Sequence, residues 1–140
     1  MKAKIINACS IILIFIMMYS SFAMASSGTG SVTVGTGSIY VTGAYGVTRT
    51  TNYDYVLVKA NSVYPTGNYT TDNFTKCKTA IYKNDNTSTR ISNVYTLTEG
   101  NGYREVKINN GYLSLSKVNV CFAGNNPEYG AVINFSYDGK

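Results

Sequence analysis

The residue types that usually perform catalysis are scarce in this chain. Its 140 residues include no histidine, so Ser-His-Asp catalysis, Cys-His catalysis and the usual zinc sites are excluded. Acid–base chemistry would fall to seven carboxylates, and these are scattered over expected turns or stand beside Lys and Arg. The chain also has no Gly-x-Ser-x-Gly motif and no phosphate-binding loop. We therefore expect a protein that is not an enzyme and that uses no cofactor.

One short run of oxygen-bearing side chains invites comparison with a calcium loop. Asn84, Asp85 and Asn86 are consecutive, and each offers a side-chain oxygen. A calcium site needs six to eight such ligands, and the run lacks the Gly and the terminal Glu of an EF-hand loop. A hydrogen-bonded Asx turn accounts for these residues at lower cost, so we expect no metal site here.

The cysteines suggest a covalent crosslink rather than a reactive thiol. Cys77 and Cys121 are the two cysteines that follow the apolar N-terminal stretch. An even pair in a small exported domain normally forms a disulfide, and a reactive thiol would need a neighbouring base that a chain without histidine does not supply. The sequence therefore predicts one disulfide between Cys77 and Cys121.

The tyrosines are the best candidates for binding. There are thirteen in the chain, and a tyrosine ring can stack on a sugar or a peptide while its hydroxyl stays in water. Tyr53 and Tyr55 alternate with Val56 and Val58, so the two rings fall on one face of the expected strand. They form either an exposed binding pair or, together with Leu57, a second core layer.

The elements that would position these residues are β-strands. No segment after the leader repeats apolar residues with a helical period, whereas alternation with a period of two recurs between turns rich in Gly, Asn and Asp. We expect an all-β domain of about seven or eight short strands, an antiparallel β-sandwich with Greek-key or meander connections. The expected strands include 38–42, 53–60, 62–64, 77–83 and 131–137.

The segment 91–118 gives the most specific structural expectation. Asn101-Gly102 and Asn110-Gly111 stand where type I′ hairpin turns would place them, because both central residues of that turn need positive φ. Two-residue turns at these positions would put Val106 and Ile108 opposite apolar partners in both hairpins and Glu99 opposite Arg104. The sequence therefore predicts a three-stranded antiparallel meander here.

The N-terminus sets the compartment. Residues 1–25 have the basic start, apolar centre and Ala-x-Ala exit of a cleaved secretory signal peptide of bacterial type. The apolar run is too short to cross a bilayer, so we expect a secreted, extracellular product with no membrane span. Residues 26–37 are expected to be a flexible Gly/Thr/Ser lead-in, and residues 38–140 the folded domain. Lys2 and Lys4 lie in the leader, so the formal charge of +5 falls by two on cleavage, too little to indicate nucleic-acid binding.

These features favour an extracellular binding or adhesion domain that recognises a glycan or a surface protein through exposed Tyr and Asn. Two other readings stay open. The uncharged stretch 28–46 suits a structural or matrix protein that assembles through its strand edges. The small size, leader and mild positive charge suit a secreted antibacterial peptide or toxin.

Overall fold

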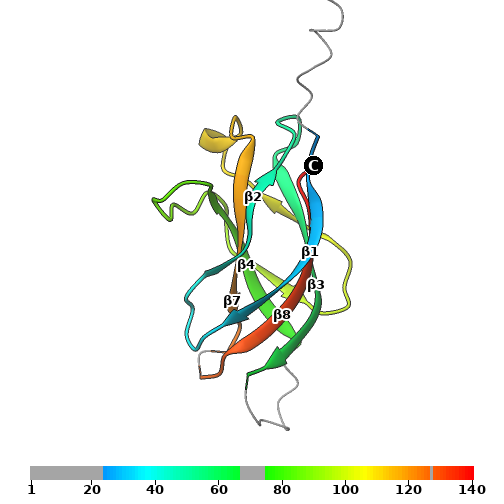
Figure 1. The fold of residues 1–140 in the computed structure, drawn as a ribbon, viewed down its shortest axis with the longest axis vertical. Coiled ribbons are helices and arrows are strands. Elements are labelled where there is room, and N and C mark those ends of the chain that lie inside the picture. Colours follow the sequence, from blue (N-terminus) through cyan, green and yellow to red (C-terminus); the bar gives the residue numbers. More distant parts are fainter. Residues whose placement is uncertain (1–23, 67–74, 127) are drawn as a thin grey trace, which may run out of the picture.

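The protein is an all-β chain with two four-stranded antiparallel sheets, as seen in a computed structural model that describes residues 24–66, 75–126 and 128–140 (Figure 1). The signal peptide prediction falls almost wholly outside these residues. The eight strands are β1 (Ser27–Val34), β2 (Val41–Thr48), β3 (Tyr55–Pro65), β4 (Lys76–Lys83), β5 (Tyr95–Thr98), β6 (Arg104–Lys107), β7 (Lys117–Gly124) and β8 (Ala131–Asp138). A single 3₁₀ turn, η1 (Asn110–Tyr112), lies between β6 and β7.

The chain changes sheet at almost every connection. The first sheet has the strand order β1-β8-β3-β6, and the second has the order β2-β7-β4-β5. Only β4 and β5 are consecutive strands that pair with each other, among the strands described. The edge strands β1 and β2 therefore lie on one side of the molecule, and the short edge strands β5 and β6 are left at the other ends of the two sheets.

One hydrophobic core joins the two sheets. Alternate residues point inward in β1, β3 and β8, as the period-two pattern predicted, and Val118, Val120 and Phe122 of β7 are fully buried together with Ile133 of β8. The centre of this core is aromatic, because the ring centroids of Phe122 and Phe135 lie 4.5 Å apart. Burial of β-branched and aromatic side chains therefore holds β7 and β8, which carry these two rings, against each other across the core.

The predicted meander is wrong. β5 pairs with β4, placing Leu97 opposite Cys77, whereas β6 pairs with β3, placing Val106 opposite Val56. Five residues separate β5 from β6, which is enough chain to cross from one sheet to the other, and the residue with positive φ is Gly100 rather than Asn101 or Gly102. Asn110-Gly111 forms the 3₁₀ turn instead of a hairpin. Leu97 and Val106 each found an apolar partner, but in two different sheets rather than in each other.

The predicted disulfide is also wrong, because Cys77 and Cys121 are free cysteines. They lie on neighbouring strands, but Cys77 stands opposite Gly124 and Cys121 stands opposite Ala80. This three-residue offset separates them by about 10 Å along the strands and, being odd, points their side chains to opposite faces of the sheet. A disulfide tolerates Cα atoms no more than about 7 Å apart, so this register does not allow the bond.

Most of the segment expected to be a flexible lead-in, residues 26–37, is the regular strand β1. All eight residues of β1 pair with β8, from Ser27 opposite Asp138 to Val34 opposite Ala131. Val34 is fully buried, and Gly30 lies against the ring of Phe135. The high glycine content that favoured flexibility instead leaves room for the aromatic side chains of β8.

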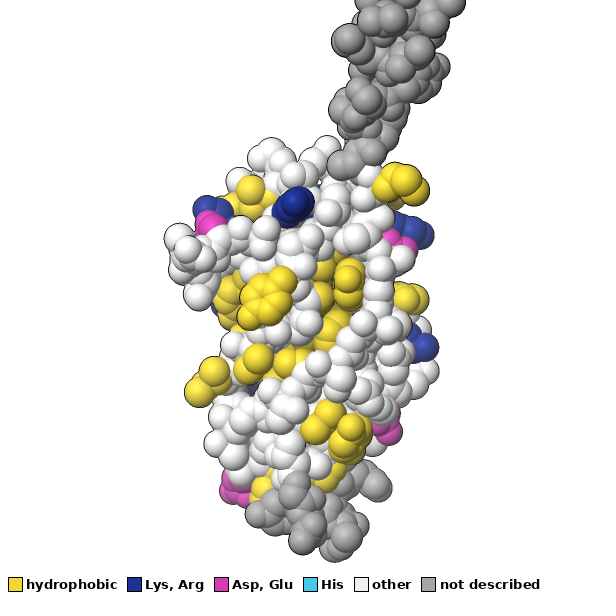
Figure 2. All heavy atoms as spheres, viewed as in Figure 1, with side chains coloured by type: hydrophobic (Ala, Val, Ile, Leu, Met, Phe, Trp, Pro, Cys, Tyr) yellow, Lys and Arg dark blue, Asp and Glu magenta, His cyan; other side chains and the backbone are white. Residues whose placement is uncertain are grey.

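The face that carries β1 and β2 is apolar at its centre, with few charged side chains (Figure 2). Tyr45 of β2 is 76% exposed, and Ile39, in the loop before β2, is 71% exposed. No helix in the described part of the chain is long and apolar enough to cross a bilayer.

Candidate functional site

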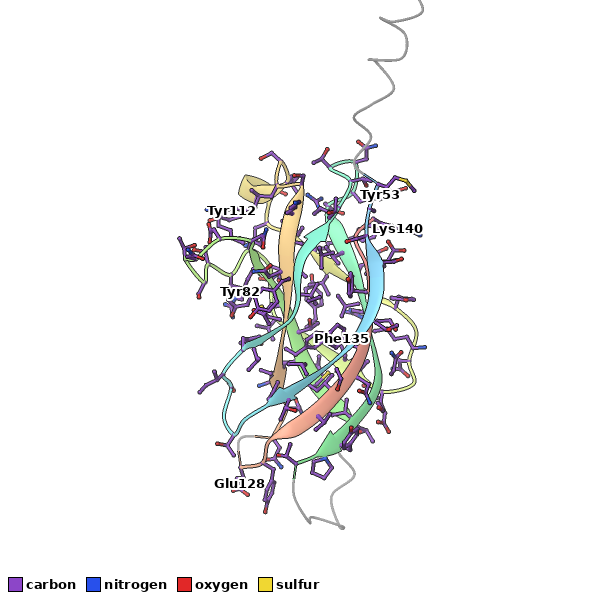
Figure 3. The ribbon with its side chains drawn as sticks, viewed as in Figure 1. Tyr53, Tyr82, Tyr112, Glu128, Phe135 and Lys140 are labelled. Atoms are coloured by element: carbon purple, nitrogen blue, oxygen red, sulfur yellow. The ribbon has the colours of Figure 1, made fainter. Side chains whose placement is uncertain are left out.

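Tyr53 and Tyr55 form a contacting pair at one end of the domain. Their ring centroids lie 5.5 Å apart with the ring planes tilted by 53°. Tyr53 precedes β3 and is 45% exposed, whereas Tyr55, on the outer face of the first sheet, is half-buried. Figure 3 shows Tyr53 at the same end of the molecule as Tyr112 and Lys140, opposite the end that carries Glu128. The pair therefore presents one open ring supported by a second.

A buried arginine holds the backbone of this pair. Arg49 is 1% exposed, and its guanidinium donates hydrogen bonds of 2.8 and 2.9 Å to the carbonyls of Leu113 and Leu115. The other guanidinium nitrogen donates to the carbonyl of Tyr53. Burial lowers the pKa of Arg49, and the nearby Asp54 charge acts in the opposite direction. The arginine thus ties the loop before β3 to the loop that follows β6.

Nothing in the sequence pattern marked Arg49. It lies in an ordinary polar run between two strands, and an arginine in such a run is normally solvated. Its burial arises only because the segments that supply the three carbonyls meet at this end of the fold. The Nε atom of Arg49 and the hydroxyl of Thr50 lack a hydrogen-bond partner within the described residues.

A further tyrosine, Tyr95 of β5, contacts the strand that pairs with Tyr55. Lys107 stands opposite Tyr55 in the β3–β6 ladder, and its amide donates a 3.4 Å hydrogen bond to the hydroxyl of Tyr95 on β5. The Lys107 side chain reaches Asp54 at 3.7 Å. Tyr95 therefore bridges the edges of the two sheets, and β6 connects it to the Tyr53–Tyr55 pair.

Two shallow, open hollows adjoin each other at the edges of β5 and β6. The larger, of about 500 Å³, is lined by Tyr95, Tyr103, Arg104, Glu105 and Lys107. The smaller, of about 210 Å³, shares Tyr103 and Arg104 with it and extends under the loop between the two strands. Tyr103 is 51% exposed, and the Arg104 guanidinium lies 5.5 Å from the centroid of the Tyr95 ring. We call Tyr53, Tyr55, Tyr95 and Tyr103 the tyrosine surface.

The sequence interpretation missed Tyr95, Tyr103 and Arg104 because it depended on the meander. That register assigned Arg104 to Glu99 and set Tyr95 against Ile108. In the structure the Glu99 carboxylate instead accepts a 2.8 Å hydrogen bond from the amide of Val63. Arg104 thereby stays free of Glu99 and turns toward Tyr95.

The Asx turn predicted around Asp85 is confirmed. The Asp85 carboxylate accepts hydrogen bonds from the amide of Thr87 at 3.0 Å and from its hydroxyl at 2.5 Å, and Lys83 lies 3.3 Å away. The bonds from Thr87 lower the pKa of Asp85, and Lys83 adds to this effect. Across the described ranges, no group of three or more His, Cys, Asp or Glu residues could hold a metal ion.

The two thiols are shielded rather than activated. Burial raises the pKa of Cys77, in the core, to about 12. Burial also raises the pKa of Cys121, whose sulfur lies 3.4 Å from the hydroxyl of Thr42. A cysteine reacts as its thiolate, so both side chains are arranged as small apolar groups.

Comparison with known proteins gives no further guide, because no protein family, curated protein or solved structure matches this chain.

Proposed function

We propose that this protein is a secreted, non-catalytic extracellular domain that binds a glycan through its tyrosine surface. The signal-peptide pattern of residues 1–25 supports export. The shared core between the two sheets supports a β-sandwich architecture, which displays loops and edge strands to a ligand without moving the core. The ligand site belongs to one end and one edge of that sandwich.

The observation that carries this proposal is that Tyr95 and Tyr103 line the larger hollow at the edge of β6, while the Tyr53–Tyr55 pair lies outside that hollow, next to Lys107. Tyr53 and Tyr103 are the open rings, 45% and 51% exposed; Tyr55 packs against Tyr53, and Tyr95 holds the Arg104 guanidinium. Ordering a tyrosine ring costs little conformational entropy, and the ring buries a large area on contact. Hydroxyl, amide and guanidinium groups beside such rings suit the alternating apolar faces and hydroxyl edges of a sugar.

Several carboxylates are engaged in structural contacts, which supports a binding role over hydrolysis. Asp54 faces Lys107, Asp85 closes its own turn, and Glu99 accepts a backbone amide. A glycosidase needs two carboxyl groups facing each other about 5–9.5 Å apart across a substrate cleft. The two hollows beside β6 are lined by one carboxylate, Glu105.

The test compares glycan binding by the wild type with binding by the double variant Tyr53→Ala/Tyr55→Ala on a glycan array and in a cell-wall pull-down. We expect the double variant to lose at least tenfold in affinity, because two stacking rings are removed. Tyr64→Ala is the matched control. Tyr64 is 47% exposed but lies nine residues along β3 from Tyr55, about 30 Å away.

The control should bind like the wild type, and circular dichroism should show the same fold for all three proteins. Equal binding by the double variant and the wild type would remove the Tyr53–Tyr55 pair from the site. Wild-type protein that binds no glycan in either assay would overturn the proposed function itself.

One observation favours assembly as a second candidate function. β1 is an eight-residue edge strand with neither proline nor charge, so it lacks the usual protection of an exposed edge. It lies on the face whose centre is apolar in Figure 2. Tyr45 of the neighbouring β2 and Ile39 before that strand are exposed. Light scattering of the wild type and of Thr29→Lys, at high concentration over days, tests this candidate. Growth in size that the lysine suppresses would support it, and constant size in both would exclude it.

A further inference from the structure

The smaller hollow at the β5–β6 loop has an unusual charge balance. Its lining comprises Ala60 of β3 and residues 96–98 and 101–104, and the only charged side chain among them is Arg104. Arg104 makes no ion pair with any residue that the structure describes. Its guanidinium is instead held beside the Tyr95 ring by a cation–π contact at 5.5 Å. The hollow therefore offers one positive charge with no acidic partner.

Free backbone amides of β5 lie at the same edge. The amide of Glu99 donates at 2.8 Å to the carbonyl of Thr75, the residue before β4, so residues 99, 97 and 95 turn their backbone groups toward β4 and its N-terminal flank. In an antiparallel ladder the intervening residues turn theirs the other way, which directs the N–H groups of Thr96 and Thr98 to the open edge. No described residue accepts from either amide. These donors and Arg104 border the same hollow.

The volume of the smaller hollow and the residues beside it indicate which ligand it could hold. The hollow is about 210 Å³, below the roughly 300–1,000 Å³ of sites that hold a drug-sized ligand, so it suits one small unit of a longer chain. Tyr103, 51% exposed, forms part of its wall, and the exposed Asn101 stands beside it. Arginine beside a free backbone N–H favours a carboxylate, and an open aromatic ring beside it favours a sugar face.

We infer that this hollow is a subsite for an acidic sugar, with the carboxylate of a uronic acid unit bound by Arg104 and one of the β5 edge amides. The inference rests on the proposed glycan-binding function and names the ligand class within it. Arg104 is three residues along β6 from Lys107, which stands opposite Tyr55, so the subsite lies about 10 Å along the strand from the Tyr53–Tyr55 pair. Because this offset is odd, Arg104 and Tyr55 lie on opposite faces of the first sheet, and a glycan chain that contacts both must pass over the exposed edge of β6.

The test is a ¹⁵N–¹H NMR titration of the protein with D-glucuronate, D-glucose and acetate at constant ionic strength. We expect D-glucuronate to shift the amide signals of Thr96 and Thr98 and the Nε–H signal of Arg104 in a saturable manner, and D-glucose to shift them far less. Arg104→Gln should weaken D-glucuronate binding about tenfold or more, because a charge-assisted contact is lost. Arg90→Gln, at an exposed arginine on another strand edge, removes the same charge and should bind like the wild type.

Each other outcome counts against the inference in a distinct way. Equal shifts with D-glucose would show a neutral-sugar site, and equal shifts with acetate would show a bare carboxylate site without sugar recognition. Equal weakening in Arg90→Gln and Arg104→Gln would show general charge attraction. Unshifted β5 signals in a protein whose array binding depends on Tyr53 and Tyr55 would overturn the acidic subsite alone. Array binding absent altogether would instead overturn the proposed function.

Discussion

Substituting Gly30 with alanine should destabilise the protein, although glycine to alanine in a strand ordinarily stabilises. A Cβ atom at Gly30 would lie 2.6 Å from Cζ of Phe135. The Phe135 ring has little room to move, because a Cβ built on Gly43 of the other sheet would stand 2.9 Å from its Cε1, and the Phe122 ring centroid is 4.5 Å away. The ring is therefore confined between two glycines and a second ring.

The expected size follows from two opposing effects. Overpacking of this kind costs about 1–3 kcal/mol. Alanine recovers about 0.5–1 kcal/mol through the lower conformational entropy of its unfolded chain. The net loss in the free energy of unfolding should be about 1–2 kcal/mol for Gly30→Ala. In a domain of this size the melting temperature should fall by roughly 5 °C or more.

Urea denaturation followed by circular dichroism measures this change, with Gly35→Ala as the matched control. No atom lies within 4 Å of a Cβ at Gly35, and its φ is not positive, so the control should be neutral or stabilised by up to about 1 kcal/mol. Phe135→Leu should reduce the penalty of Gly30→Ala in the double variant, because the shorter side chain leaves the space that the methyl needs.

Gly30→Ala should therefore lower the free energy of unfolding, whereas Gly35→Ala should leave it unchanged or raise it. Wild-type or greater stability in Gly30→Ala would show that the strand does not lie against Phe135. That result would favour the earlier expectation that residues 26–37 form a flexible segment.

Three further predictions test other parts of the structure. Arg49→Ala should lower the free energy of unfolding by about 2–4 kcal/mol in urea denaturation, since three carbonyls lose their donor, and a change below about 0.5 kcal/mol would contradict its role. In the native protein, Cys77 and Cys121 should resist alkylation at pH 8 and react fully after denaturation without reductant, whereas thiols appearing only after reduction would show a disulfide. In an NMR titration, Asp85 should have a pKa below its ordinary value of 3.8, and Thr87→Val should raise that pKa toward it. Because the folded-state pKa is lowered, the stability that Asp85 contributes should be present above pH 3.8 and be lost as the pH falls through the folded-state value. An unchanged Asp85 pKa in Thr87→Val would refute the contact.

Local patterns predicted the parts of the fold that depend on near neighbours. The alternation of Ala131, Ile133 and Phe135 identified a buried strand face, and these three residues are at most 1% exposed. The Asx turn at Asp85 likewise depends on residues two positions apart, so its hydrogen bonds could be predicted from the local order of side chains.

Pairing between strands could not be predicted in the same way. Val106 needs an apolar partner across the ladder, but Leu97, Leu115 and Val56 meet that need equally, and nothing local ranks them. Two strands joined by a five-residue loop can pair or separate into different sheets at similar local cost. The choice between them depends on burial across the whole core, which determines where β5 and β6 end.

The sequence by itself determined an all-β chain, because β-branched and aromatic residues that alternate with polar ones bury their side chains on one face of a strand. It also placed Tyr53 and Tyr55 on one face, through the two-residue period of a strand. Only the tertiary structure decided that Cys77 and Cys121 stay apart, since that depends on a three-residue offset between β4 and β7. It also decided that Tyr95, Tyr103 and Arg104 surround a hollow beside the first tyrosines. Register and sheet membership come from the packing of distant segments into one core, and no segment carries that information alone.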